Sequence, residues 1–186
     1  MNDIYNEMTD PIVRLLGEWA GEICIASAAL RIALSVLFSA VIGCERANKR
    51  HAAGLRTFIL VSFSSTVAML LDEYFAAAVG SKFTIISAAA VVGIAIISSN
   101  SILYSSKNQI KGLTTSVALW SCGIIGLSAG SGLYTISIIC FVALLCCLSL
   151  LPRAERLLKN RSNHFEIHLE LKNKGDLQDF ISTIRK

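Results

Sequence analysis

Four charged side chains lie inside or at the ends of long apolar runs, where they could bind an ion or a charged partner beside a lipid bilayer. Arg31 stands inside a long apolar run, where an arginine costs about 2.5–3.5 kcal/mol to insert and normally faces a polar partner or water. Glu45 leaves the same run and Arg56 begins the next one, so a tight hairpin brings them close enough to pair or to form a polar site with Arg46. These residue types favour recognition of an ion or of a charged partner.

The loop between these two runs is basic and ends in a Gly-Leu-Arg-Thr sequence formed by Gly54, Leu55, Arg56 and Thr57. We expect Gly54 to lie in the turn and Thr57 to cap the returning helix. A plain basic loop on the cytoplasmic side would explain the cations. It would not require this particular ending.

Metal, cofactor and covalent chemistry find little support in the sequence. The six cysteines lie within or at the ends of apolar runs, so most are expected to be small buried hydrophobic residues, with Cys44 and Cys122 beside the motifs described here. The three histidines share no helix face with carboxylates in a zinc-type arrangement. We therefore expect no metal, no cofactor and no enzymatic activity.

The composition is that of a membrane protein. Hydrophobic residues make up 54% of the 186 residues and charged residues only 16%, against about 25% in ordinary soluble domains. The net charge of +4 does not indicate nucleic-acid binding, because the cations cluster beside apolar runs without interleaved aromatic residues. Most of the chain should therefore contact a lipid bilayer.

Five apolar runs are long enough for transmembrane helices of about 20 residues, at 23–43, 58–79, 83–104, 113–130 and 132–151. Lysine and arginine concentrate in the first loop, in the third-to-fourth connection and after the last run, so this side is cytoplasmic. The predicted fold is an all-α membrane protein, a bundle of five transmembrane helices with its N-terminus outside and its C-terminus inside.

Two flanking segments complete the domain prediction. Residues 1–22 form an extracytoplasmic amphipathic segment, since apolar residues recur there at helical spacing among acidic ones. Residues 23–151 form the transmembrane domain. Residues 152–186 form a basic juxtamembrane linker and a short cytoplasmic tail in which a strand-like stretch precedes a helical one, a βα unit too small to fold alone.

Small residues predict how the helices meet, because membrane helices associate where glycine, alanine and serine let backbones approach. The first run carries Ser27, Arg31, Ser35, Ser39 and Gly43 at every fourth position. We expect this run and the fourth to be interior helices. The glycines expected at helix contacts are Gly43, Gly93, Gly123, Gly126 and Gly130.

Arg31 falls on this small-residue stripe, so we expect it to point into the bundle. Three kinds of partner are open to it: a backbone carbonyl, water, or polar residues of the third run. Those polar residues are Ser98, Ser99 and Asn100.

Four stretches together resemble the MgtC/SapB family of bacterial inner-membrane proteins in order and spacing, at 31–46, 53–57, 112–120 and 126–134. The resemblance covers about residues 28–150. One departure is clear, because the third run keeps Gly93 but lacks the glycines that usually follow it in this family. Ser98, Ser99 and Asn100 occupy that part of the run.

The resemblance implies a five-helix membrane domain, often followed by an ACT-like cytoplasmic domain of which 152–186 would be a part. It implies a cytoplasmic motif made of Glu45, Arg46, Gly54, Leu55, Arg56 and Thr57. It also implies a motif at the start of the fourth helix, made of Gly112, Leu113, Thr114, Thr115 and Trp120.

The function implied by this resemblance is regulation of other membrane proteins, such as the rotary ATP synthase or transporters, in magnesium homeostasis, stress adaptation and virulence. A transporter or channel for magnesium or protons is the alternative, which Arg31, the polar third run and Glu45 support. Its weakness is the small number of intramembrane carboxylates for a divalent cation. A homodimer is expected from the glycine faces and the unclosed tail sheet.

Overall fold

The computed structural model describes residues 10–48, 53–80, 84–104, 110–154 and 157. The chain divides into two units, Met1–Pro152 and Arg153–Lys186, and the fold below is that of the first. The predicted βα tail lies outside the described residues.

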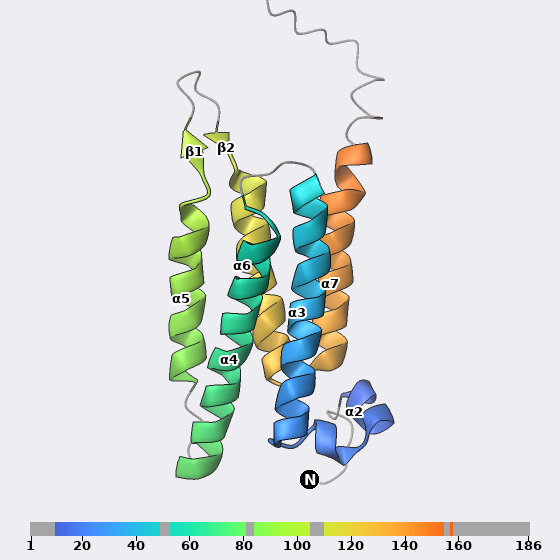
Figure 1. Ribbon diagram of the computed structural model, residues 1–186, viewed down its shortest axis with the longest axis vertical. Helices are drawn as coiled ribbons and strands as arrows, with labels where there is room; N and C mark the ends of the chain where they lie inside the picture. The colour runs from blue at the N-terminus through green and yellow to red at the C-terminus, as the bar shows by residue number, and fades with distance from the viewer. Residues whose placement is uncertain (1–9, 49–52, 81–83, 105–109, 155–156, 158–186) are drawn as a thin grey trace, which may run out of the picture. The chain divides into compact units, whose positions relative to one another are not determined.

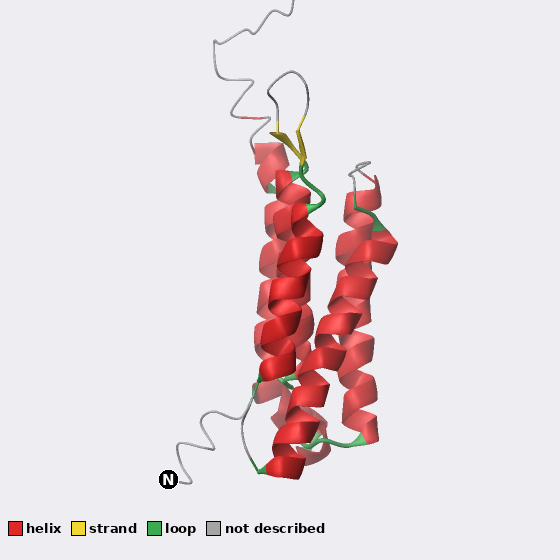
Figure 2. Ribbon diagram, turned by 90° about the vertical axis from the view of Figure 1, so that its left-hand side faces the viewer, coloured by secondary structure: helices red, strands yellow, loops and turns green. Residues whose placement is uncertain are grey.

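The first unit is a bundle of long helices with a small β-hairpin at one end and a short helix at the other (Figure 1). In chain order its elements are α2 (Pro11–Leu16), the 3-10 helix η1 (Glu18–Ala20), α3 (Ile25–Asn48), α4 (Leu55–Val79), α5 (Ile85–Ser99), β1 (Leu103–Tyr104), β2 (Ile110–Lys111), α6 (Leu113–Gly130) and α7 (Tyr134–Ser149). The long helices lie side by side in both views (Figure 2).

Among the described residues, four helices are long and apolar enough to cross a membrane: α3, α4, α6, and α7 with its continuation to Ala154. The fifth apolar helix, α5, has only 15 residues, which span roughly 22 Å at 1.5 Å per residue. The third predicted run was expected to continue to residue 104, but its helix ends at Ser99. The chain is therefore a multi-pass membrane protein with four clear candidate spans.

A short β-hairpin, which was not predicted, is added to an otherwise helical fold. After α5 the chain pairs Leu103 with Lys111 and Tyr104 with Ile110 in an antiparallel ladder. This hairpin carries the chain back to Gly112, where α6 begins.

The helix α4 lies at the centre of the bundle and packs against α3, α5 and α6. The fourth predicted run, now α6, is interior as expected, and 10 of its residues are buried. The ring of Phe141 stacks on that of Phe38 at 4.7 Å and joins α7 to α3. The sequence pattern did not single out α4, although its serine and threonine residues face both neighbours.

Glycines allow the closest helix contacts. A Cβ atom at Gly43 would lie 2.8 Å from the Cα atom of Leu55, where α3 meets the start of α4. A Cβ atom at Gly126 would collide with the backbone of Ser62, so α6 and α4 touch there backbone to backbone. Gly123 and Gly130 are similarly crowded.

Gly93 differs from this pattern and corrects the prediction for that position. A Cβ atom there would meet nothing within 4 Å, so Gly93 makes no close helix contact in the described bundle. The reason is that α5 turns Ile94, not Gly93, toward Gly123 of α6.

Candidate functional site

An ion pair joins α3 to α4 near the end of the bundle that carries α2. Arg31 is the seventh residue of α3, and its Nη1 atom lies 2.6 Å from Oε2 of Glu73 in the last turns of α4. The arginine is 1% exposed and the glutamate 21%. This pairing neutralises a charge that would otherwise be costly inside an apolar bundle.

Backbone carbonyls complete the environment of Arg31. Its Nη1 atom donates to the carbonyl of Gly130 at 2.7 Å, and Nη2 donates to the carbonyls of Ala20 and Gly21 at 3.4 and 3.3 Å. A Cβ atom at Gly132 would lie 2.9 Å from Nη2, so the glycine makes room for the guanidinium. The arginine thus links the N-terminal segment, α3, α4 and the end of α6.

Of the partners left open for Arg31, the backbone carbonyl is confirmed, and Glu73 is a further partner that was not expected. The third run does not contribute, because Ser98, Ser99 and Asn100 lie at the hairpin end of α5, whereas Arg31 lies near the opposite end (Figure 1).

The segment before α3 is tied to the same end of the bundle. The hydroxyl of Tyr134 donates to the carbonyl of Ala20 at 2.9 Å, and this ring is 1% exposed. Asp10 accepts from the backbone N–H of Ile12 at 2.9 Å and from that of Thr135 at 2.8 Å, so one carboxylate caps both α2 and α7. The N-terminal segment therefore closes over the end of the bundle at the α7 side.

The hydrogen bonds to Asp10 shift its titration. Burial alone would raise the pKa of this carboxyl, but the bonds from the hydroxyl and backbone of Thr135 and from Ile12 outweigh it and lower the pKa below its ordinary value. Asp10 therefore stays ionised, and keeps both caps, at any pH above the ordinary range of an aspartate.

A row of buried hydroxyl groups, which we call the hydroxyl seam, runs along the centre of the bundle. It consists of Ser35 and Ser39 of α3 with Ser62 and Thr66 of α4. The oxygens of Ser35 and Ser62 are 2.9 Å apart, and the Thr66 hydroxyl lies 2.7 Å from that of Ser35. Thr66 also lies 2.9 Å from the carbonyl of Gly126, which brings α6 into the row.

Hydroxyl groups both donate and accept, so Ser35, Ser62 and Thr66 satisfy one another inside an apolar bundle, while Ser39 donates to the carbonyl of Ser35 in its own helix. In lipid, such bonds between helices are worth about 0.6 kcal/mol on average. The hydroxyl seam therefore holds α3, α4 and α6 together without placing a net charge between them.

A second charged pair lies at the opposite end of α3. This helix continues past Gly43 to Asn48, so Glu45 and Arg46 belong to its last turns and not to the loop. The Nε atom of Arg46 lies 3.1 Å from Oε2 of Glu45, and the hydroxyl of Ser149 on α7 reaches Oε1 at 3.5 Å. Arg46 is 2% exposed, which places a second arginine inside the bundle.

The Gly-Leu-Arg-Thr ending differs from its expected role. Gly54 is the N-cap residue of α4 in an extended conformation, and no side chain caps this helix. Thr57 therefore does not cap α4, because it already lies in the first turn of the helix with its side chain exposed. Leu55 and Arg56 are exposed as well, so the expected pairing of Arg56 with Glu45 is replaced by the contact between Glu45 and Arg46.

The motif at the start of α6 has one strict backbone requirement. Gly112 adopts a φ of 89°, and a Cβ atom there would collide with the carbonyl of Ser101. Thr115 is buried, whereas Leu113, Thr114 and Trp120 are exposed on the outside of the bundle. Only part of this motif thus faces the interior.

The polar end of the third run contributes one buried contact. Ser98 is 3% exposed, and its carbonyl accepts from the hydroxyl of Ser116 on α6 at 2.7 Å. Ser99 and Asn100 are exposed. Within the described residues, no three histidine, cysteine, aspartate or glutamate side chains gather as a metal site would require.

The sequence itself now places this chain among known proteins. The model of the MgtC family matches residues 32–157, which run from Ile32 within α3 through α7. The chain belongs to the MgtC family. The matched range includes Glu73, Glu45 and Arg46 of the two charged pairs. Arg31 lies one residue before it.

Several relatives support the assignment to the MgtC family. YhiD of Escherichia coli strain K12, whose name proposes magnesium transport, is 31% identical over 157 residues, covering 81% of this chain and 73% of YhiD. SapB of Bacillus subtilis strain 168 is 25% identical over 166 residues, covering 84% and 72%. SrpB of Synechococcus elongatus is 30% identical over 154 residues, covering 76% and 80%. No solved structure matches the chain.

Two acidic residues of this MgtC family member were missed as parts of the site. Neither Asp72 nor Glu73 was among the predicted site residues. Glu73 holds Arg31, and Asp72 accepts the backbone N–H groups of Ile86 and Ser87 at 3.0 and 2.6 Å, which caps α5 from a neighbouring helix. The position along the helices could have indicated this partner. Because α3 and α4 are antiparallel, a residue near the start of α3 lies level with the end of α4.

Proposed function

We propose that this protein is a non-enzymatic regulator of other membrane proteins in the bacterial inner membrane, acting in magnesium or ion homeostasis, stress adaptation or virulence. The supporting observation is that the charged side chains inside the bundle pair with one another or cap helices. Arg31 pairs with Glu73, Arg46 lies against Glu45, and Asp72 caps α5. These charges hold helices together, which suits a scaffold that presents its outer surface to partners.

The proposal includes five membrane crossings with the N-terminus outside and the C-terminus inside. The helix α5 runs beside α4 and α6 and is shorter than α4 (Figure 1), and we infer that it crosses the bilayer despite its 15 residues. Local thinning of the bilayer accommodates a short span at modest cost. The positive-inside rule places the end with Arg46 and Arg56 in the cytoplasm, so the acidic residues Asp10, Glu22, Asp72 and Glu73 belong to the outer end.

The proposed contact surface for a partner is the outward side of α5. The glycines of α6 and the stripe of α3 pack inside the bundle, so they are not available to other proteins. Ala89 is exposed and Gly93 has free space above it, four residues further along. Two small residues at this spacing allow another helix to approach closely, whether from a partner protein or from a second copy of this chain.

The second candidate function is transport of magnesium or protons. The name of YhiD favours it, and so does the hydroxyl seam, which lies between the pair at Arg31 and the pair at Arg46. Against it stands the commitment of Glu45 and Glu73 to arginines, because a divalent cation needs carboxylate oxygens that are free to bind it.

The deciding experiment has two arms. Purified protein in liposomes should show no saturable magnesium or proton flux beyond that of protein-free liposomes. In cells, a photo-crosslinking amino acid at position 89 should capture a membrane protein, and the same probe at exposed Val117 on α6 serves as the control.

Saturable flux that Glu45→Gln and Thr66→Val abolish would make the protein a transporter and overturn the regulator. Capture at position 89 that Gly93→Leu abolishes, without flux, would support the regulator. A crosslink only to a second copy would assign the α5 surface to a homodimer and leave no partner site there.

A further inference from the structure

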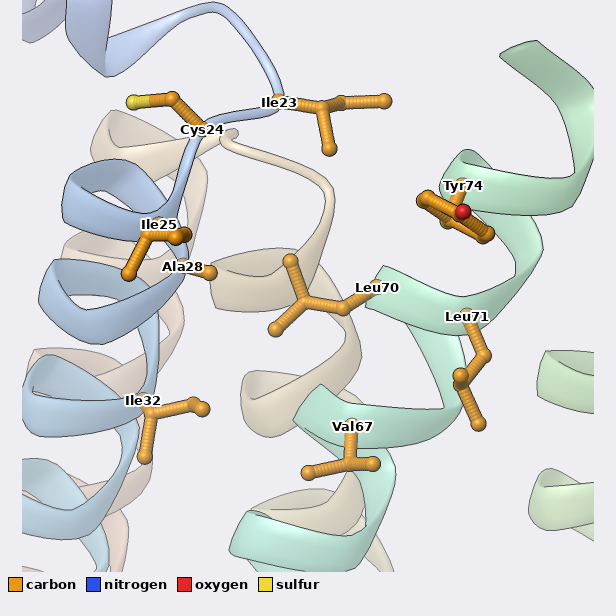
Figure 3. Close-up of a pocket in the computed structure, with 9 residues that line it drawn as sticks. All are labelled: Ile23, Cys24, Ile25, Ala28, Ile32, Val67, Leu70, Leu71 and Tyr74. Atoms are coloured by element: carbon orange, nitrogen blue, oxygen red, sulfur yellow. The ribbon is translucent and has the colours of Figure 1, made fainter. Parts of the chain in front are cut away.

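A lateral groove opens between the first turns of α3 and the last turns of α4, with a volume of about 440 Å³. Figure 3 shows Ile32 and Val67 at its inner end and Ile23, Cys24 and Tyr74 at the other. Its lining is aliphatic apart from the thiol and the phenol at this mouth. The groove is therefore a slot for an apolar chain with a polar mouth.

The groove lies at lipid depth and stays open to the side. Both of its walls are candidate membrane spans, and Ile25 and Ile32 are separated by seven residues, roughly 10 Å along a helix. The described part of the N-terminal segment, from Asp10 onward, lies elsewhere, because Val13 of α2 packs with Tyr134 on the α7 side of the bundle. In a bilayer, the slot faces acyl chains.

In the described part of the chain, the carboxylate next to the mouth that pairs with no cation is that of Glu22, which directly precedes Ile23 and is exposed. Glu73 beside Tyr74 is 21% exposed and is paired with Arg31. The nearby cation Arg31 is 1% exposed and points at carbonyls and at Glu73, so its charge is directed into the bundle. Such a mouth favours an ammonium group and disfavours a head group with net negative charge.

We propose that this groove binds one acyl chain of a phospholipid whose head group carries a primary ammonium, with Glu22 as the partner of the ammonium. Ala28 forms the floor of the slot, where its small side chain leaves room for the chain. Tyr74, which is 61% exposed, donates its hydroxyl to the lipid phosphate at the membrane interface.

The test measures which lipid the full-length purified protein retains. Protein is exchanged into vesicles with equal parts of phosphatidylethanolamine, phosphatidylglycerol and phosphatidylcholine, extracted, and examined by native mass spectrometry. We expect phosphatidylethanolamine to be retained about tenfold over phosphatidylglycerol, since a charge-assisted hydrogen bond is among the stronger polar contacts. Glu22→Gln, at an exposed position, should reduce this preference to near parity.

A matched pair of variants tests the groove itself. Ala28→Phe fills the slot and should abolish lipid retention, whereas Ala143→Phe adds the same ring to an exposed position of α7 and should retain lipid normally. Val67→Ala, which widens the slot, keeps the test open if the first variant does not fold.

Three results would overturn the proposal. Equal retention of the three lipids by the native chain would exclude the ammonium, and normal retention by Ala28→Phe would exclude the groove. A photo-crosslinker at position 71 that captures a polypeptide in place of a lipid would assign the groove to a protein helix.

Discussion

At the residue scale, the pair of Arg31 and Glu73 makes the sharpest prediction. Glu73→Gln leaves a buried arginine without its counter-charge, and breaking one side of a buried pair costs about 3–5 kcal/mol. Because Glu73 is 21% exposed, we expect a loss near the lower limit, about 3 kcal/mol. Chemical unfolding of the purified protein in detergent measures it.

The control for this prediction is exposed Glu22, whose change to glutamine should alter the stability by less than about 0.5 kcal/mol. Replacing both partners, with Arg31→Met and Glu73→Leu, should restore most of the stability because no unpaired charge remains. A double variant as unstable as Glu73→Gln would show that the arginine acts through its carbonyl contacts instead.

Two glycines give opposite predictions for the same substitution. Gly126→Ala forces a Cβ atom into the backbone of Ser62, which cannot move as a flexible side chain would, so we expect a loss of about 1–3 kcal/mol or more. Gly93→Ala meets empty space and should stabilise α5 by up to about 1 kcal/mol through helix propensity. Thermal unfolding of the two variants side by side compares them, and equal losses would contradict the packing described here.

At the element scale, the sequence predicted where helices lie better than where they end. Apolar runs located α3, α4, α6 and α7, because about 20 lipid-compatible residues leave a strong signal. The end of α3 was missed, since Glu45 and Arg46 look like loop residues until their contacts with each other and with Ser149 on α7 are known. Helix termini fixed by distant residues cannot be derived from local pattern.

Asp10 caps the start of α7, which is far from it in the sequence, and this contact predicts an effect of pH. Its pKa is lowered in the folded protein, where burial would raise it but the bonds from Thr135 and Ile12 lower it more. The stabilisation is therefore complete above the unfolded pKa of about 3.9 and is lost as the pH falls through the lower folded value. As the pH falls through that folded value, we expect the N-terminal segment to loosen from α7.

The fluorescence of Trp19, next to this segment, reports the change. In the native chain the signal should shift only in acid, whereas Asp10→Asn should show the acid form's signal already at neutral pH. Because Trp120 also emits, both titrations are made in a Trp120→Phe background, whose exposed ring lies on α6. A native signal at neutral pH equal to that of Asp10→Asn would contradict the double cap.

At the scale of the whole molecule, the arrangement of the helices was only partly accessible from the sequence. Periodic small residues placed α3 and α6 inside, but they did not show that α4 lies between them. The partner of Arg31 followed from that arrangement, because the end of α4 brings Glu73 level with the start of α3. The family resemblance predicted the order of the motifs along the chain. Their contacts became known only from the packing of α4 in the structure.

The orientation in the membrane is the last prediction, and two thiol positions at opposite ends decide it. Cys24 precedes α3 at the end that we place outside, and the hydrogen bonds from the backbone and hydroxyl of Ser27 lower the pKa of its thiol, which favours reaction at neutral pH. Arg56→Cys places a thiol at the other end, on an exposed position of α4.

In variants that retain one thiol each, a membrane-impermeant maleimide should label Cys24 in intact cells and position 56 only after permeabilisation. The reverse pattern would place the acidic end with Asp10, Asp72 and Glu73 in the cytoplasm, against the positive-inside rule. It would also move the groove beside Tyr74 into the cytoplasmic leaflet. Orientation therefore decides which leaflet supplies the lipid to the groove, because its mouth lies at one end of the bundle only.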